Sequence, residues 1–288
     1  MFRINKMTRG RFGNKILQYN TLRQLSSILG VGYSCPNWEG NKIFDLSLSS
    51  ENQQVYKQEK LLTWRECIEP NWDSLKEMSN KYDLIIDDPA YLLHNTFFQL
   101  SQTSPRKFLP IKEHLSKILP SDRVNVGIHI RGTDFLTADN GKEVHPFDYY
   151  CKSVEEVANN ISDPFFIICT DDITYDLVGQ VINMLSAKNF EFSMGRPDNL
   201  FYDFLILAHC EVLISTSSTF AVTAGMLGLS DKKIIHYSKW LKRCVDNIPW
   251  NKKALEDNDT RQWHKSFDNF WKIIHEGGSE HYKMWRMI

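Results

Sequence analysis

A histidine, an arginine and an aspartate lie close together where an apolar stretch ends, in the peptide V-G-I-H-I-R-G-T-D-F at residues 126–135. Side chains of a strand alternate between its two faces, so His129 and Arg131 point to the same side. If this stretch is a strand of an open α/β sheet, both residues lie at the carboxyl edge of the sheet, where ligands usually bind. A guanidinium stays charged and can hold a phosphate or pyrophosphate through two parallel hydrogen bonds. Arg131 is therefore a candidate for an anion site, with a structural ion pair as the alternative.

A second polar cluster, Thr170-Asp171-Asp172, directly follows the apolar stretch 165–169. Threonine and aspartate are favoured at the start of a helix, and a helical pattern follows, so helix capping is one interpretation. A second is that one carboxylate contacts the base or ribose of a nucleotide. A third is that both carboxylates bind a metal ion that accompanies a diphosphate. The sequence leaves these three interpretations open.

Five consecutive hydroxyl residues, Ser215-Thr216-Ser217-Ser218-Thr219, precede a helical pattern rich in small residues at 220–225. The free N–H groups at a helix start favour an anion, and small residues allow close approach. A capping role alone would need one hydroxyl, so the run favours an anion site.

A fourth cluster, R-G-R-F-G-N at residues 9–14, precedes a helical pattern that contains Gln18 and Tyr19. Its glycines allow unusual backbone angles and close approach of a ligand. The peptide lacks the lysine and hydroxyl of a phosphate-binding Walker loop, and its glycine spacing is not that of a dinucleotide-binding fingerprint.

The elements that must position these clusters alternate along the second half of the chain. Strands are predicted at 123–130, 164–169, 190–193, 211–215 and 233–237, the last of the sheet, and helices at 147–161, 173–185, 200–209 and 219–229. The first part predicts strands at 3–7 and 81–87, and helices at 14–29 and 111–119. This alternation predicts an α/β fold of parallel sheets covered on both faces.

The segment Pro120-Ser121-Asp122 is the best boundary between two domains, residues 1–121 and 122–288. Five tryptophans follow residue 238, and the helical spacing near 264–275 predicts a helical tail that packs back on the body of the protein.

Composition limits the functional classes. The 288 residues include 34 basic and 35 acidic side chains, a net charge of -1 that argues against a broad nucleic-acid surface but not against a small basic pocket. The six cysteines form no C-x-x-C pair, which fits a reducing compartment. Neither a signal-peptide core nor an apolar stretch of about 18 residues is present, so we expect a cytoplasmic protein, at most peripheral at a membrane face.

Taken together, the four clusters resemble the fucosyltransferase superfamily that shares an H-x-R-x-x-D peptide, most of all the α-1,2-fucosyltransferases of glycosyltransferase family 11. The family peptide G-G-L-G-N-Q-x-x-Q-Y has its counterpart at residues 10–19, and H-x-R-R-G-D-Y or H-x-R-R-T-D-Y at residues 129–135. Tyr149-Tyr150 and the T-D-D at 170–172 match in the same order, as does the stretch from Asp203 to Ala224.

This resemblance implies a GT-B architecture, in which two Rossmann-like domains face each other across a cleft. The carboxyl-terminal domain would bind GDP-fucose and the amino-terminal domain an oligosaccharide or glycolipid acceptor. The reaction would be inverting and metal-independent, and would need no cofactor beyond the donor substrate.

The resemblance also implies roles for individual residues. Arg131 would neutralise the departing diphosphate, and His129 would contact or orient the nucleotide. Asp134 is the leading candidate for the general base, with Glu143 and His145 as alternatives, although Asp134 could equally brace its own loop. The remaining substrate-binding candidates are Ser217, Ser218 and Thr219 for the diphosphate, Asp171, Asp172 and Asp203 for ribose and guanine, and Gly13, Asn14 and Gln18 on the acceptor side.

Two positions depart from the family pattern. Gly132 stands where the family has a second arginine, a contact that Arg196 could replace, and Ala221 and Val222 stand where it has tryptophans. Two other hypotheses therefore stay open: the same fold with another GDP- or UDP-sugar donor, and a catalytically silent protein that binds a nucleotide or a glycan.

Overall fold

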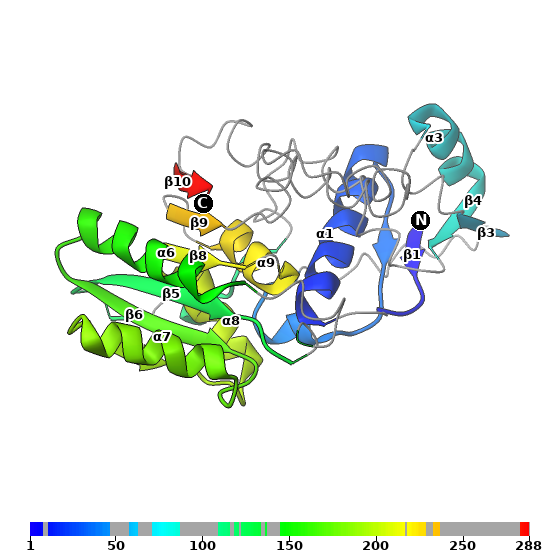
Figure 1. Cartoon of the computed structure of the whole chain (residues 1–288). Coiled ribbons are helices and arrows are strands. Elements are labelled where there is room, and N and C mark those ends of the chain that lie inside the picture. The colour runs from blue at the N-terminus through cyan, green and yellow to red at the C-terminus, as the bar shows by residue number, and fades with distance from the viewer. Residues whose placement is uncertain are drawn as a thin grey trace, which may run out of the picture. The chain divides into compact units, whose positions relative to one another are not determined.

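The computed structural model describes residues 1–7, 11–46, 58–62, 71–86, 109–115, 118–120, 122–133, 136, 145–216, 218–228, 233–236 and 283–287. Of these, the residues up to Lys112 belong to one compact unit, unit 1, and those from Glu113 onward to a second, unit 2. Figure 1 labels most of the helices and strands of both units. The predicted division into residues 1–121 and 122–288, with acceptor and donor binding assigned to them, stays a prediction.

Unit 1 contains a parallel sheet in the order β2-β1-β4-β3. Its strands are β1 (Phe2–Ile4), β2 (Tyr33–Ser34), β3 (Gln58–Leu62) and β4 (Tyr82–Ile86), and its helices are α1 (Phe12–Leu29) and α3 (Trp72–Lys81). Helix α1 ends at Gly30, whose φ of 65° is the left-handed conformation that glycine adopts without strain. The apolar side chains of β1, β4 and the second half of α1 form one core, which includes Phe2, Ile4, Leu22, Leu25, Leu84 and Ile86.

The prediction of a helix at 111–119 is wrong for its first residues. Ile111 instead pairs with Phe44 in an antiparallel bridge. The backbone N–H of Asp45 donates to the carbonyl of Pro110 at 2.8 Å, and that of Lys112 donates to the carbonyl of Ile43 at 2.9 Å. These long-range bonds hold residues 110–112 beside residues 43–45, and among the described residues that follow, Glu113–Leu115 form a 3-10 turn.

Unit 2 contains a parallel sheet in the order β10-β9-β8-β5-β6-β7. Its strands are β5 (Val124–Ile130), β6 (Pro164–Thr170), β7 (Phe192–Met194), β8 (Val212–Ser215), β9 (Lys233–His236) and β10 (Lys283–Met287). Its helices are α6 (Phe147–Asn160), α7 (Asp176–Ala187), α8 (Leu200–His209) and α9 (Thr219–Leu227). The strands and helices predicted between residues 123 and 237 are confirmed, with ends that shift by up to three residues.

The two faces of β5 pack against different helices, because side chains alternate along a strand. Val126, Ile128 and Ile130 belong to a core with the apolar side of α6 and α7. On the other face, a Cβ at Gly127 would lie 2.9 Å from the sulfur of Cys210 and 3.0 Å from Leu207 of α8. The sheet is therefore covered on both sides, as the α/β prediction expected.

The chain end differs from its prediction. The stretch at 233–237 is not the last strand, because Lys283–Met287 adds β10 in parallel to the edge of β9. Main-chain pairing with the open edge of the sheet makes these residues a strand. The helical spacing near 264–275, on which the predicted helical tail rests, lies outside the described residues. The tryptophans from 240 to 271 lie outside the described residues. In the described part of the chain, no helix combines the length and the apolarity that a membrane crossing requires.

Candidate functional site

Three of the predicted clusters meet at one edge of the sheet in unit 2. Strand β5 lies between β6 and β8, and all three run parallel, so their carboxyl ends share this edge. Arg131 follows β5, Asp171 follows β6, and Thr216 follows β8. The sequence placed these residues up to 85 positions apart, and the topology brings them together.

Asp171 holds the loop that follows β5. Its carboxylate accepts hydrogen bonds from Arg131 Nη1 at 2.7 Å, from the backbone N–H of Gly132 at 2.8 Å, and from Thr133 Oγ1 at 2.6 Å. Thr133 has a φ of 37°, an uncommon left-handed conformation for a β-branched residue, which surrounding contacts must maintain. Asp171 supplies two such contacts, at Thr133 itself and at the residue before it.

Arg131 is therefore a cation with a defined position. Its side chain is 10% exposed and that of Asp171 is 22% exposed, so this ion pair is shielded from bulk solvent. The structural ion pair that the sequence offered as an alternative does exist. It is compatible with an anion site, because a guanidinium has five N–H donors and the pair engages Nη1.

His129 is buried beside Arg131 and is electrically neutral. Its Nδ1 shares a hydrogen bond of 2.6 Å with Thr216 Oγ1, and its ring lies 5.6 Å from that of Phe220 in α9. Burial, with the neighbouring charge of Arg131, lowers the pKa of His129 to about 3. At neutral pH His129 can offer a hydrogen bond, but it does not add a positive charge to the site.

The hydroxyl-rich turn after β8 begins α9. Ser218 is the residue before the helix, and its Oγ accepts from the backbone N–H of Phe220 at 3.3 Å. The N–H of Ser218 donates to Thr216 Oγ1 at 3.4 Å, which links this turn to His129. Thr219 is the first residue of α9. Ser217 lies outside the described residues.

Two tyrosines of α6 fix the carboxyl ends of the strands. Tyr149 Oη donates to the carbonyl of Ser215 at 2.6 Å, and Tyr150 Oη donates to the carbonyl of His129 at 3.3 Å. Both rings are buried and meet edge to face, with centroids 5.0 Å apart. The tyrosine pair that contributed to the family resemblance thus has a structural role at this edge.

Asp172 and Asp203 sit in different surroundings from Asp171. Asp172 Oδ1 accepts from the N–H of Thr174 at 2.9 Å and from its hydroxyl at 2.6 Å, which stabilises the turn before α7. Asp203, in the first turn of α8, is 4% exposed and accepts from the N–H of Arg196 at 2.5 Å. Burial raises the pKa of Asp203 to about 6.

Because Gly132 has no side chain, its loop can pack closely against Asp172. A Cβ at this residue would lie 3.2 Å from the Cβ of Asp172, so a larger side chain would require a local shift. The candidate replacement for the missing arginine, Arg196, is exposed near the end of β7, with its guanidinium carbon 4.7 Å from the centroid of the Tyr202 ring.

Of the other predicted site residues, three belong to unit 1, one packs beside Tyr149, and two are not described. Gly13, Asn14 and Gln18 lie in α1 of unit 1, where Gly13 and Gln18 are buried. Asp134 and Glu143 fall outside the described residues. His145 is buried, with its ring 5.4 Å from that of Tyr149.

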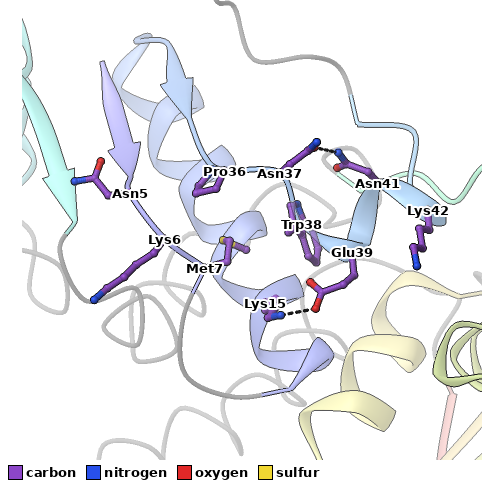
Figure 2. Close-up of a pocket in the computed structure, with 10 residues that line it drawn as sticks. All are labelled: Asn5, Lys6, Met7, Lys15, Pro36, Asn37, Trp38, Glu39, Asn41 and Lys42. Atoms are coloured by element: carbon purple, nitrogen blue, oxygen red, sulfur yellow. Dashed lines mark hydrogen bonds and ion pairs between the residues drawn. The ribbon is translucent and has the colours of Figure 1, made fainter.

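Unit 1 contains a pocket that the sequence reasoning missed. It has a volume of about 690 Å³ and follows the carboxyl ends of β1 and β2 (Figure 2). Its lining residues are Asn5, Lys6, Met7, Lys15, Pro36, Asn37, Trp38, Glu39, Asn41 and Lys42. The signal that could have located it is the rule used for Arg131: polar segments that directly follow strands of a parallel sheet.

Within the described residues, no three His, Cys, Asp or Glu side chains gather as metal ligands would. Metal independence stays a prediction, as do the site assignments above.

The fold is of the GT-B class. Residues 1–264 match the model of Glycosyl transferase family 11, and the chain therefore belongs to that family. The predicted family and GT-B fold class are confirmed.

Solved structures with a similar fold include POFUT1 in complex with GDP-fucose, with a TM-score of 0.58, 12% identity, and coverage of 82% of this chain and 97% of that chain. POFUT1 in complex with GDP has a TM-score of 0.55 at 12% identity, with coverage of 82% and 97%. A mutant of Arabidopsis thaliana FUT1 in complex with GDP has a TM-score of 0.51 at 11% identity, with coverage of 82% and 70%. Comparison with curated proteins gives no match.

Proposed function

We propose that this protein transfers fucose from GDP-fucose to a hydroxyl of an acceptor glycan, with inversion at the anomeric carbon and an α-1,2 linkage in the product. Membership of family 11 supports glycosyl transfer. The choice of donor is supported by the fold that the chain shares with POFUT1, whose solved structures include complexes with GDP-fucose and GDP.

The observation that carries this proposal is the position of Arg131. In the reaction the acceptor oxygen forms a bond to the anomeric carbon of fucose, while the bond from that carbon to the diphosphate oxygen breaks and GDP leaves with the electron pair. Negative charge grows on the departing diphosphate. A cation that is already held in place stabilises this charge without reorganisation, and the ion pair with Asp171 holds Arg131 in this way. In this proposal no metal ion is needed for that task.

Other groups at the same edge would complete the donor site. The N–H groups at the start of α9, with the hydroxyls of Ser217, Ser218 and Thr219, would bind the diphosphate. Neutral His129 would offer a hydrogen bond to the nucleotide, and Asp172 or Asp203 would contact ribose or guanine. Asp171 is assigned to positioning, because its carboxylate already accepts three hydrogen bonds from the loop after β5.

The acceptor side rests on the family resemblance, with Gly13, Asn14 and Gln18 as its candidates. Asp134 would take the proton from the acceptor hydroxyl as general base, with Glu143 and His145 as alternatives. A cytoplasmic enzyme of this kind would meet an oligosaccharide or a lipid-linked glycan at the membrane face.

The test is a panel of nucleotide sugars, measured by thermal shift and by hydrolysis or transfer. GDP-fucose should be used in preference to other GDP-sugars and to UDP-sugars, whereas preference for another donor would retain the fold and overturn the assignment of fucose. Binding of GDP without turnover of any donor would instead identify a silent binding protein.

A variant series connects the activity to its proposed centre. Arg131→Ala should lower the rate of transfer by about two orders of magnitude or more, by analogy with the loss of one donor to a developing oxyanion. The matched control is Arg123→Ala, which removes an arginine paired with Asp163 and Glu191 at the opposite end of the sheet. Near-normal turnover by Arg131→Ala would remove this residue from the mechanism.

A further inference from the structure

The pocket in unit 1 has the size and position of a ligand site. Its volume of about 690 Å³ lies within the range of roughly 300–1,000 Å³ that is usual for small-molecule sites. Residues 5–7 follow β1 directly, and residues 36–42 follow β2, so the pocket lies at the carboxyl ends of two adjacent parallel strands. This is the part of an α/β sheet where ligands bind.

The lining of this pocket is basic, in contrast to the nearly neutral chain. It contains three lysines and one glutamate, hence a net charge of +2, against -1 for all 288 residues. Lys15 forms an ion pair with Glu39, and the hydrogen bond from Lys15 lowers the pKa of Glu39. The charge of Lys42 also lowers this pKa, so Glu39 is ionised at neutral pH and offsets one of the three lysine charges of the lining.

Figure 2 shows how these charges are distributed. Lys6 and Lys42 lie at opposite ends of the group of lining residues, and the pair of Lys15 and Glu39 lies between them. Lys6 and Lys42 are both exposed, so an incoming anion can reach either.

The rest of the lining is suited to a sugar. Asn5, Asn37 and Asn41 carry amides that can donate and accept, as hydroxyl groups of a sugar require. Asn41 Nδ2 donates to Asn37 Oδ1, so two of the amides already orient each other. Met7 and Pro36 provide apolar contact area for the C–H groups of a sugar ring.

Trp38 gives this pocket a rigid floor. It is 7% exposed, and its ring lies 5.4 Å from Tyr19, 5.9 Å from Phe12 and 6.3 Å from Phe44 between centroids. The indole also packs over Gly40, where an added Cβ would lie 2.4 Å from the ring. A floor of this kind keeps the amides and lysines in a fixed arrangement before a ligand arrives.

We propose that this pocket binds an acidic sugar of the acceptor glycan, with Lys6 and Lys42 as the residues that select its negative charge. The inference rests on the proposed transfer function and names the chemical class of its acceptor. A nucleotide phosphate is the competing ligand, and the three amides together with the apolar contact area of Met7 and Pro36 favour a sugar over it.

The experiment uses the full chain and an array of synthetic oligosaccharides in matched pairs. Each pair differs at one sugar, with a neutral hexose in one member and a uronic acid, a sulfated hexose or a phosphorylated hexose in the other. The variants are Lys6→Ala, Lys42→Ala and the double variant, and the matched control is Lys76→Ala, an exposed lysine on α3 of the same unit. Binding and transfer are both recorded, and GDP affinity reports separately on the donor site.

For at least one of the three kinds of acidic sugar, the wild-type protein should bind the acidic oligosaccharide about tenfold more tightly than its neutral counterpart, through charge-assisted hydrogen bonds. The double variant should lose this preference, each single variant should lose part of it, and Lys76→Ala should retain it. The affinity for GDP should be the same in all four variants, and added salt should weaken the preference.

Equal binding of neutral and acidic members by the wild-type protein would overturn the proposal. Preference that survives in the double variant would also overturn it, as would competition by GDP for the array signal that depends on Lys6 and Lys42. If no nucleotide sugar is turned over, the proposed function fails, but the array still decides whether this pocket takes an acidic glycan.

Discussion

The Arg131 guanidinium and the Asp171 carboxylate lie 2.7 Å apart, on the loops that follow two adjacent parallel strands. The same carboxylate accepts from Gly132 and Thr133, so one side chain both orients the cation and shapes its loop. Asp171 therefore helps to hold Arg131 in position.

The first prediction concerns Asp171→Asn. An amide keeps the shape of the side chain but loses the charge and offers one acceptor oxygen where the carboxylate offers two. We expect transfer to slow by about ten- to a hundredfold, because a misplaced charge stabilises the leaving group poorly. Urea denaturation should show a loss of about 1.5–3 kcal/mol in the free energy of unfolding.

The control is Asp163→Asn, which acts on the other arginine pair of the same two strands. Arg123 lies 2.6 Å from Asp163, which is 70% exposed, so solvent screens this pair and its loss should change the free energy of unfolding very little. Transfer should be unchanged. If Asp171→Asn behaves like Asp163→Asn in both measurements, Asp171 does not position Arg131.

The second prediction concerns the charge of His129. Its pKa of about 3 in the folded protein is lower than the value of about 6.5 in the unfolded chain. The unfolded state therefore binds more protons below pH 6.5, and the free energy of unfolding should fall with decreasing pH by up to about 1.4 kcal/mol per pH unit. His129→Gln should lose this dependence.

NMR gives the direct check on His129. Its imidazole signals can be assigned by their loss in His129→Gln. Their chemical shifts should stay constant between about pH 5.5 and 8, whereas those of a free histidine change over this range. A titration midpoint near 6.5 would show that His129 carries a charge and would change its assigned role.

The third prediction concerns Asp203 and has the opposite sign. Burial raises the pKa of Asp203 to about 6, above the value of about 4 for the unfolded chain. The folded state then binds the extra proton, so this contribution to stability is complete below pH 4 and is lost as the pH rises through 6. The shift corresponds to a loss of up to about 3 kcal/mol between these limits.

Asp203→Asn isolates this contribution, because an amide oxygen can still accept from the N–H of Arg196. The difference in free energy of unfolding between Asp203→Asn and the wild-type protein should shift in favour of the variant between pH 4.5 and 7. A difference that does not change with pH would mean that Asp203 titrates as an exposed carboxyl does.

The fourth prediction compares the two tyrosines of α6. Tyr149→Phe leaves the buried carbonyl of Ser215 without the 2.6 Å hydrogen bond and should cost about 1–3 kcal/mol in the free energy of unfolding. Tyr150→Phe removes a longer bond of 3.3 Å to the carbonyl of His129 and should cost less. Thermal or urea unfolding of the two variants measures this difference. Equal losses of unfolding free energy in Tyr149→Phe and Tyr150→Phe would contradict the prediction.

Much of unit 2 could be predicted from local patterns. The buried strands β5, β6 and β8 are short apolar runs bounded by polar turns, and α6 and α7 have apolar residues at helical spacing. Helix α8 was predicted at residues 200–209, as observed. The same reasoning located Arg131 and Asp171 separately, because each directly follows a strand.

What the sequence could not predict was which residues would meet. The three bonds to Asp171 depend on the parallel pairing of β5 and β6, between residues about 40 positions apart. The failures have the same cause: Ile111 pairs with Phe44, and Lys283–Met287 pairs with β9. The pocket in unit 1 depends on two segments, after β1 and after β2, neither of which carries a recognisable motif.

The measurement that tests the central claim most directly is a crystal structure of the full chain with GDP. The account predicts that diphosphate oxygens lie within about 3 Å of the Arg131 guanidinium, which is the length of a charge-assisted hydrogen bond. Arg131 should keep its contact with Asp171 in that complex. A diphosphate bound at another place, out of reach of Arg131, would contradict the account.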